Sequence, residues 1–332
     1  MNISRFRPDN FTLALLATVT LASVFPVTGS AAQAFEYITT AAIGLLFFLH
    51  GAKLSREAIL AGIGHWRLHL LVTGCTFFMF PVLGLLLRPL LSPLVTPDLY
   101  VGIMYLCVLP ATVQSAIAFT SMARGNIAAA ICSASASTLL GVFITPILVN
   151  LLVVQGGKSD ISLDSVGRIM LQLLVPFVIG NMLRPWIGNW VSRNAKTLKF
   201  VDQGSILLVV FTAFSAAVAE GLWRDTPVAA FIGMLVICVV LLALALTATA
   251  WLSRRLGFNK ADEITIVFCG SKKSLASGIP MAKLLFASHA VGAVVLPLML
   301  FHQIQLMVCA VLAQRYANRP SPDMLPIAAA RQ

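Results

Sequence analysis

The sequence predicts an all-α polytopic membrane protein with ten transmembrane helices. Of its 332 residues, 59% are hydrophobic and only 11% are charged, whereas a soluble chain carries about 25% charged residues. The apolar residues gather in ten runs, each close to the roughly 20 residues that a helix needs to cross a bilayer. No linker between the runs is long enough, or rich enough in Ser, Pro or Gly, to mark a second domain. We therefore expect a single membrane domain over residues 1–332.

The ten runs define the expected spans in chain order: residues 11–28, 36–52, 68–90, 100–123, 127–154, 167–183, 204–221, 227–252, 264–286 and 290–313. Polar, basic connections separate most of them, for example 184–202 between the sixth and seventh spans. The first run can be read as a signal peptide, because it follows a basic segment and precedes the small residues at 31–34. It is long for the apolar part of a signal peptide, so we expect it to be retained as the first helix.

The basic residues predict the orientation in the membrane. With the N-terminus inside, the inner segments carry 16 of the 23 lysines and arginines and the outer connections carry 5, while Lys272 and Lys273 lie within a span. Such a bias favours cytoplasmic N- and C-termini in a bacterial-type inner (plasma) membrane. The net charge of +11 does not indicate nucleic acid as a partner, because the basic residues lie between apolar runs and form no single patch. The expected surroundings are the lipid bilayer.

The spans divide into two units of five, about residues 11–154 and 167–313, and an odd count inverts the second unit relative to the first. The fourth span is interrupted at 110–115, and its counterpart, the ninth, is interrupted at 270–274 and followed by Gly278 and Pro280. Broken helices at matching positions of two halves are typical of transporter binding sites. Backbone groups freed in hydrocarbon must be buried or face a polar cavity. We therefore expect discontinuous helices 4 and 9 to meet inside the protein.

A pair of adjacent lysines, Lys272 and Lys273, lies near the middle of the ninth span. The distance from the acids at its boundary places them roughly 13 Å deep, and each costs about 2.5–3.5 kcal/mol to insert there. Neighbouring residues on a helix diverge by about 100°, so the two side chains either reach different partners or lie in an unwound segment. We favour unwinding, because Ser271 and Ser274 flank the pair. The expected spans contain no acid to neutralise it, since Glu36 and Glu220 lie only at span ends, which leaves a substrate anion, loss of a proton or nearby carbonyls.

Other residues indicate what the protein does not do. The six cysteines lie in apolar runs without CxxC or other metal spacing, so we expect neither disulfides nor metal ligands, and no cofactor. Apart from Glu36 and Glu220 at their ends, the expected spans lack carboxylates, and they contain no HExxH or GxSxG motif, which argues against an intramembrane enzyme. His302 and Gln303 of the tenth span either contact the region of the breaks or form interhelical hydrogen bonds.

Four segments carry a resemblance to a known family: 112–126 (TVQSAIAFTSMARGN), 271–275 (SKKSL), 278–281 (GIPM) and 296–303 (LPLMLFHQ). With them the whole chain resembles the bile acid:sodium symporter family, and within it the subgroup of the vertebrate orphan seventh member of solute carrier family ten. The resemblance implies ten helices in two inverted five-helix repeats, forming a panel and a core domain. It also implies that helices 4 and 9 cross at their breaks, where relatives bind sodium, and that a cavity between the domains carries amphipathic organic anions.

The resemblance transfers the sodium ligands only in part. The matching positions on the fourth helix are Gln114 and Ser115, and hydroxyl ligands on the fifth fall near Ser133 and Ser135, so a sodium ion is expected near Gln114, Ser115 and Ser135. A glutamine of the third helix maps to Thr76. In the ninth helix the family's sodium-binding glutamate falls at Phe268 and its glutamine at Lys272. We hypothesise that a lysine ammonium replaces one or both sodium ions, which leaves sodium or proton as the coupling ion.

The sequence thus predicts a secondary-active transporter, a symporter of a small organic anion that works by alternating access. The alternative is a non-transporting membrane regulator or a component of an ion pathway. The residues expected to hold ion or substrate are Thr112, Gln114, Ser115, Ser133, Ser135, Ser271, Lys272, Lys273, Ser274, His302 and Gln303.

Overall fold

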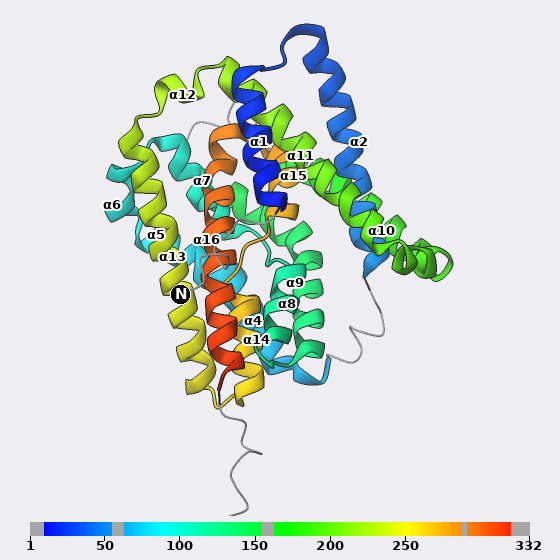
Figure 1. The fold of residues 1–332 in the computed structure, drawn as a ribbon, viewed down its shortest axis with the longest axis vertical. Coiled ribbons are helices and arrows are strands. Elements are labelled where there is room, and N and C mark those ends of the chain that lie inside the picture. Colours follow the sequence, from blue (N-terminus) through cyan, green and yellow to red (C-terminus); the bar gives the residue numbers. More distant parts are fainter. Residues whose placement is uncertain (1–9, 55–62, 154–162, 287–290, 320–332) are drawn as a thin grey trace, which may run out of the picture.

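The computed structural model describes residues 10–54, 63–153, 163–286 and 291–319 (Figure 1). All regular structure in these ranges is helical. The elements are α1 (Asn10–Val24), α2 (Gly29–Lys53), η2 (Ile63–His65), α4 (Trp66–Gly74), η3 (Cys75–Met79), α5 (Phe80–Leu86), α6 (Arg88–Leu91), η4 (Ser92–Leu94), α7 (Pro97–Val108), α8 (Gln114–Met122), α9 (Ile127–Leu148), η5 (Val149–Val153), α10 (Leu163–Arg193), α11 (Ala195–Ala219), α12 (Leu222–Asp225), α13 (Val228–Arg255), α14 (Lys260–Gly270), α15 (Leu275–Leu285) and α16 (Val291–Ala317).

Seven helices within the described ranges are long and apolar enough to cross a bilayer: Gly29–Lys53, Trp66–Leu86, Ile127–Val153, Met170–Arg193, Ala195–Ala219, Val228–Arg255 and Val291–Ala317. The other three expected spans are shorter helices. The first is α1, with 15 residues, and the fourth and ninth are each divided into two halves, α7 with α8 and α14 with α15. The predicted interruptions are therefore present, and the count of ten spans stays a prediction.

The sixth and seventh spans are longer than the hydropathy pattern suggested. Helix α10 continues to Arg193, and α11 begins at Ala195, so most of the expected connection 184–202 is helical. Asp202 consequently lies inside a helix, where it is buried and paired with Lys53 of α2. Long basic side chains can lie along apolar surface with their charge in water, which lets a helix continue through a basic segment. The expectation that acids lie only at span ends was therefore wrong for Asp202, and also for Glu36, which lies inside α2.

Side-chain caps begin the short halves. Asn259 accepts a hydrogen bond from the backbone of Asp262 at the start of α14, and Ser274 accepts one from Ser277 at the start of α15. Thr96 does the same for α7, with proline at its first position. Each cap satisfies one amide that the helix leaves unpaired and contributes about 1 kcal/mol. Such caps matter most for short helices, which are marginal on their own.

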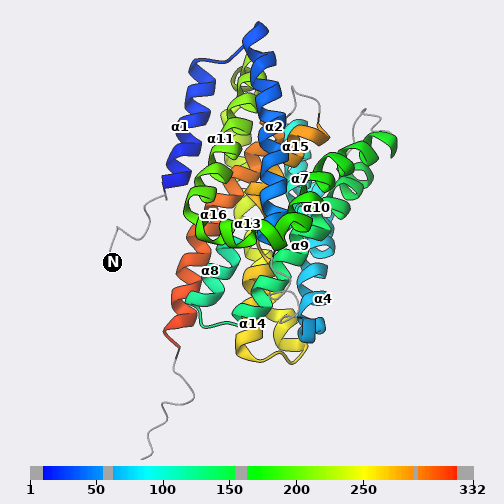
Figure 2. The ribbon, with the colours of Figure 1, turned by 90° about the vertical axis from the view of Figure 1, so that its right-hand side faces the viewer.

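Helices of the two halves of the chain pack against each other in reciprocal pairs. Helix α1 packs on α11, and α2 packs on α10 (Figures 1 and 2). Two glycines allow the close contact of α2 with α10. A Cβ atom at Gly51 would lie 1.9 Å from the carbonyl oxygen of Phe177, and one at Gly180 would lie 2.0 Å from that of Phe48. In a membrane, where helices associate by van der Waals packing, small residues at such contacts set how closely backbones approach.

We predict that Gly51→Ala destabilises the protein, because the new methyl group overlaps backbone that cannot rotate away. Forced overpacking costs roughly 1–3 kcal/mol. Gly44→Ala on the same helix is the matched control, since a Cβ atom there meets nothing within 4 Å, and alanine favours a helix interior by about 1 kcal/mol over glycine. Thermal unfolding of the purified variants in one detergent checks both. Equal stability of Gly51→Ala and the wild type would contradict the packing described.

Candidate functional site

The two helix interruptions meet in the interior of the bundle. Residues 109–113 separate α7 from α8, and residues 271–274 separate α14 from α15. The backbone N–H of Ser274 donates to the carbonyl of Pro110 at 2.9 Å, so the two unwound segments pair directly. The hydroxyl of Tyr105 adds a second link when it donates to the carbonyl of Gly278 at 2.6 Å. The breaks thus satisfy part of each other's backbone, as interior irregular structure requires.

Carbonyls at the end of α7 lose their helical partners, because the helix stops before Pro110. The carbonyl of Val108 accepts a hydrogen bond from the hydroxyl of Thr145. The carbonyls of Cys107 and Leu109 both accept from the ammonium group of Lys273, each at 2.8 Å. The C-terminal end of a helix carries partial negative charge, so a cation is favoured there. Lys273 therefore supplies the charge that the end of α7 attracts.

A third carbonyl comes from the π-helical turn η3. The Lys273 ammonium donates to the carbonyl of Thr76 at 2.7 Å. In a π-helix this carbonyl would accept the N–H five residues later, but that residue is Pro81, which has none. The Lys273 ammonium also lies 4.2 Å from the centre of the Phe80 ring. Three carbonyls and one aromatic face thus surround a fully buried ammonium group.

The backbone of Lys273 is held from α16. The side-chain oxygen of Gln305 accepts from its N–H at 2.9 Å, and the amide nitrogen of Gln305 donates to its carbonyl at 3.0 Å. That same amide nitrogen lies 2.9 Å from Nδ1 of His302. One glutamine thus replaces both backbone partners that the unwound segment has lost.

Lys272 reaches a different partner, as the divergence of adjacent side chains predicts. Its ammonium group lies 4.1 Å from the ring centre of Phe119 and 5.4 Å from that of Phe268. Its hydrogen bond is long, 3.5 Å to the hydroxyl of Ser115. Phe268 stands where the family resemblance puts a glutamate, so an aromatic face occupies the position expected for a carboxylate. Lys272 is fully buried but less tightly held than Lys273.

A cavity of about 310 Å³ lies beside the two breaks. The first turns of α8 and α15 line one side of it, with α9 and α16, and helices α1, α2, α10 and α11 line the other. Six of the predicted site residues face it: Thr112, Gln114, Ser115, Ser135, Ser274 and His302. This group includes the expected sodium ligands, Gln114, Ser115 and Ser135, and it contains no lysine of the pair.

The other predicted residues lie elsewhere. The hydroxyl of Ser133 is 2.7 Å from Nδ1 of His69, and that of Ser271 donates to the carbonyl of Val267. The side-chain oxygen of Gln303 accepts a hydrogen bond from Thr12 of α1 at 2.7 Å. Both lysines are buried behind the breaks and do not line the cavity. Lys273 acts on the cavity through the backbone that it supports, and Lys272 through its long hydrogen bond to Ser115.

Charged groups that the sequence analysis did not single out face the cavity. Lys53 forms an ion pair with the buried Asp202, and the exposed Lys199 also lines the wall. Within the described part of the chain, the second oxygen of Asp202 and Nδ1 of His50 have no hydrogen-bond partner although both are buried. Unpaired buried polar atoms are costly. In a cavity wall they are positions where water or a ligand would bind.

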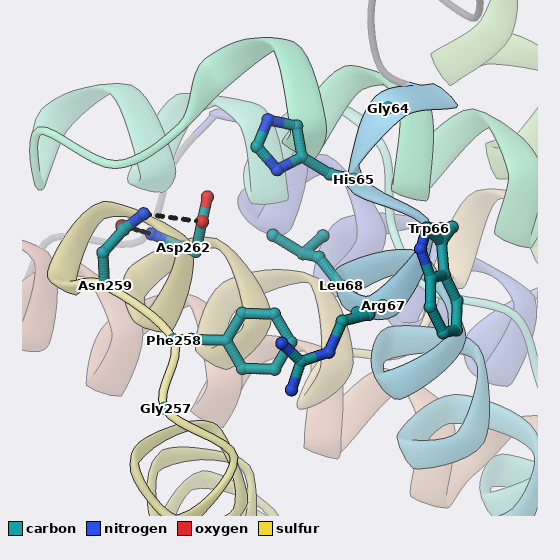
Figure 3. A pocket seen from close by; sticks show the side chains of 9 residues that line it. All are labelled: Gly64, His65, Trp66, Arg67, Leu68, Gly257, Phe258, Asn259 and Asp262. Atoms are coloured by element: carbon teal, nitrogen blue, oxygen red, sulfur yellow. Dashed lines mark hydrogen bonds between the residues drawn. The ribbon is translucent and has the colours of Figure 1, made fainter.

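A second hollow, of about 300 Å³, lies at the end of the bundle where α14 begins (Figure 3). Figure 3 shows the guanidinium of Arg67 against the ring of Phe258 and the carboxylate of Asp262 bonded to Asn259. The other oxygen of Asp262 accepts from Asn126 at 2.9 Å. Both carboxylate oxygens of Asp262 thus accept hydrogen bonds from side chains of the protein. No predicted site residue lines this hollow.

Asn126, the last residue of the segment 112–126 that carries part of the family resemblance, fixes the turn after α8. Its backbone N–H bonds to the carbonyl of Ala261 and to the hydroxyl of Thr265, and that hydroxyl donates to the Asn126 carbonyl. Arg124 in the same turn has φ of 56°, in the left-handed region. The turn after α8 is thus fixed to the first turn of α14, which joins the two broken helices at this end of the bundle.

Comparison with known proteins covers nearly the whole chain. The profile of the SBF-like CPA transporter family matches residues 9–318. A Pseudomonas aeruginosa protein whose name, PA2026, assigns no function is 68% identical over 96% of both chains. The Escherichia coli (strain K12) protein named "Putative symporter YfeH" is 61% identical over 94% of this chain and 93% of its own. "Sodium/bile acid cotransporter 7" of Mus musculus is 29% identical over 93% of both chains.

Proposed function

The chain belongs to the SBF-like CPA transporter family, which makes it a multi-pass membrane transporter and not an enzyme, and from this premise we propose that it carries an organic anion by secondary-active transport. The observation that supports this most is the single cavity on which both helix interruptions converge. Alternating access needs a site between two groups of helices that move against each other. We take the helices that line the cavity to form these two groups, α1, α2, α10 and α11 in one and α8, α9, α15 and α16 in the other.

The charge of the cavity favours an anion. Lys53 and Lys199 outnumber the one acid, Asp202, among the residues that line it. Helices α8 and α15 both begin at the wall, and a helix N-terminus carries partial positive charge with unpaired N–H groups. Broken helices commonly direct such ends at the anionic group of a substrate. A cavity of about 310 Å³ is at the lower limit for small-molecule sites and suits a small carboxylate.

We further propose that ten spans form two inverted five-helix repeats. The reciprocal packing of α1 on α11 and of α2 on α10 supports this, since the first span of each half contacts the second span of the other. If the two halves of the chain are exchanged, the contact of α1 with α11 becomes the contact of α10 with α2. The paired breaks in the fourth and ninth spans follow the same rule.

Sodium coupling is the point at which this chain departs from the family pattern. We propose that the Lys273 ammonium is a resident cation that takes the place of a coupling sodium ion. Carbonyl oxygens are the usual ligands of hard cations in broken helices, and here three of them bind an ammonium. Proton coupling then remains as the source of energy for transport.

The positive-inside pattern and the cavity together suggest an inward-open state in a bacterial-type inner membrane with both termini cytoplasmic. The cavity lies at the end of α2 marked by Lys53, and an ion pair joins α2 to α15 toward the opposite end. There Lys283 of α15, whose side chain is 4% exposed, contacts Glu36 of α2 at 2.9 Å. The hydroxyls of Thr39 and Thr212 meet nearby, at 2.9 Å. Because the ion pair joins the two groups of helices, it must break when the opposite end opens.

We predict that Glu36→Gln shifts the protein toward the outward-open state. A half-exposed ion pair contributes up to about 1 kcal/mol, which corresponds to a population change of roughly fivefold. A cysteine at Ser215, a buried residue beside this contact, reports the opening by its rate of labelling with a membrane-impermeant maleimide. Glu220→Gln, at the same end of α11, is the control. Equal labelling rates in Glu36→Gln and Glu220→Gln would refute the role of the ion pair.

The proposed function is tested in two steps. A panel of organic anions is first screened by thermal shift on the wild type and on Lys53→Gln, and an anion that stabilises only the wild type is a candidate substrate. Counterflow of that labelled anion into proteoliposomes then separates a carrier from a non-transporting regulator. Binding without counterflow would favour the regulator, and the absence of any stabilising anion would contradict an organic-anion site.

A further inference from the structure

A groove of about 820 Å³ lies between α13 and α16 and shares no lining residue with the cavity. The two helices run side by side and end at the same end of the bundle (Figure 1). Its walls are apolar toward the middle of the bundle, with Leu246 on α13, Val267 on α14, and Val308 and Val311 on α16. Exposed apolar residues are expected on a surface that faces lipid. Two features distinguish this face from other apolar faces of the bundle: it is hollow, and charged side chains lie at one end of the hollow.

The groove ends on two arginines, Arg254 and Arg315, in the last turns of α13 and α16. Arg254 is already paired, since its guanidinium donates to Glu263 at 3.0 and 3.1 Å. Arg315 is exposed and has neither a hydrogen bond nor an ion pair within the described part of the chain. Trp251, which is 59% exposed, lines the groove at the same level. An exposed tryptophan beside arginine is typical of the membrane interface.

We propose that this groove binds a phospholipid of the cytoplasmic leaflet, with an acyl chain along Val308 and Val311 and an anionic headgroup phosphate on Arg315. Apolar walls that end on an unpaired guanidinium match the two parts of such a lipid. Basic pockets between helices on the cytoplasmic side are where anionic headgroups bind, and arginine binds phosphate through two parallel hydrogen bonds. The proposal goes beyond transport and does not depend on the substrate.

The bound lipid would support the broken helix that carries the lysines. Tyr316 lines the groove, and its hydroxyl donates to Glu263 in the first turn of α14. Its ring lies edge-on to that of Phe268, with centres 6.1 Å apart. Phe268 in turn flanks Lys272. A lipid that packs against Tyr316 therefore stabilises the half-helix on which the interruption depends.

The test is native mass spectrometry of the full-length, detergent-purified protein with phosphatidylglycerol and phosphatidylcholine of identical acyl chains. We expect phosphatidylglycerol to bind the wild type roughly fivefold more tightly, since one arginine near the surface contributes about that preference. Arg315→Gln should remove the preference and Arg315→Lys should retain most of it. Arg193→Gln, which changes an exposed arginine in the last turn of α10 that does not line the groove, should leave it unchanged.

The acyl chain is tested separately. Val311→Trp fills the groove at an exposed position, so it should weaken binding of both lipids without loss of folding, which size-exclusion chromatography confirms. An unchanged lipid preference in Arg315→Gln, or normal binding of both lipids to Val311→Trp, would overturn the proposal. Displacement of phosphatidylglycerol by an equal concentration of inorganic phosphate would do the same, since it would show a phosphate site without a lipid site.

Discussion

Replacement of Lys273 with methionine is expected to destabilise the protein by roughly 3 kcal/mol, because it leaves buried carbonyl oxygens without a donor. The ammonium group satisfies the carbonyls of Thr76, Cys107 and Leu109. Pro81 has no N–H to offer Thr76, and the N–H of Ala111, the helical donor to Cys107, bonds to Ser137 instead. For a chain of 332 residues, the loss corresponds to a fall in Tm of roughly 4 °C. Thermal unfolding in a fixed detergent at low sodium measures it.

Lys272→Met is the matched control for this prediction. The two lysines are adjacent and equally buried, but Lys272 makes one long hydrogen bond and otherwise contacts aromatic faces. Methionine packs well against aromatic rings, so the change should cost little. A similar fall in Tm for both variants would show that the carbonyl contacts of Lys273 have no special role.

The same site should become a sodium site when the ammonium is removed. In Lys273→Ser the three carbonyls remain and the side chain no longer fills the space between them. Sodium should then raise the Tm of this variant in a concentration-dependent way, while potassium and N-methylglucamine should not. The wild type should show no such effect, because its own cation already occupies the carbonyls.

Neutralisation of Lys53 is expected to have a large effect on transport. Lys53→Gln removes a cation from the cavity wall and leaves the buried Asp202 unpaired, so the cavity no longer favours an anion. Loss of one charge-assisted contact of about 1.5–3 kcal/mol lowers uptake roughly ten- to hundredfold. Initial rates of uptake of the anion found by thermal shift, in proteoliposomes at matched protein content, measure the loss.

Three further variants separate charge from folding. Lys53→Arg keeps the charge and should keep most uptake, and Lys196→Gln, an exposed lysine of α11 that does not line the cavity, should behave as the wild type. The double variant with Lys53→Gln and Asp202→Asn should recover stability but not uptake, because the unpaired acid is gone and the cation is still missing. Full uptake by Lys53→Gln would show that Lys53 does not bind the anion.

The broken helices could be predicted from the sequence because their causes are local. Pro110 removes a backbone donor, and Gly270 with its serines weakens the ninth helix at a fixed distance from polar boundaries. The helix ends could not be placed as well. The hydropathy pattern ended the sixth span at residue 183. Helix α10 nevertheless continues to Arg193, because the polar residues in its last turns are exposed and need no apolar surroundings.

The candidate site was predictable in composition but not in arrangement. Sequence alone left several partners for the lysine pair, and only the bundle shows that carbonyls hold Lys273 while aromatic rings flank Lys272. The contact of Gln305 with the interruption could have been suspected, because Gln305 lies one helical turn after His302. Any other polar residue of the tenth span could have been suspected on the same ground. The pair of Lys53 with Asp202 joins residues 149 positions apart, and no local pattern indicates it.

The central claim is that the Lys273 ammonium takes the place of a coupling sodium ion. Its most direct test is uptake of the identified anion into proteoliposomes that carry wild type or Lys273→Ala, with an inward sodium gradient or an inward proton gradient imposed in turn. We predict that wild-type uptake responds to the proton gradient and not to sodium, and that Lys273→Ala loses this uptake. Strict dependence of the wild type on sodium, with unchanged uptake in Lys273→Ala, would contradict the account.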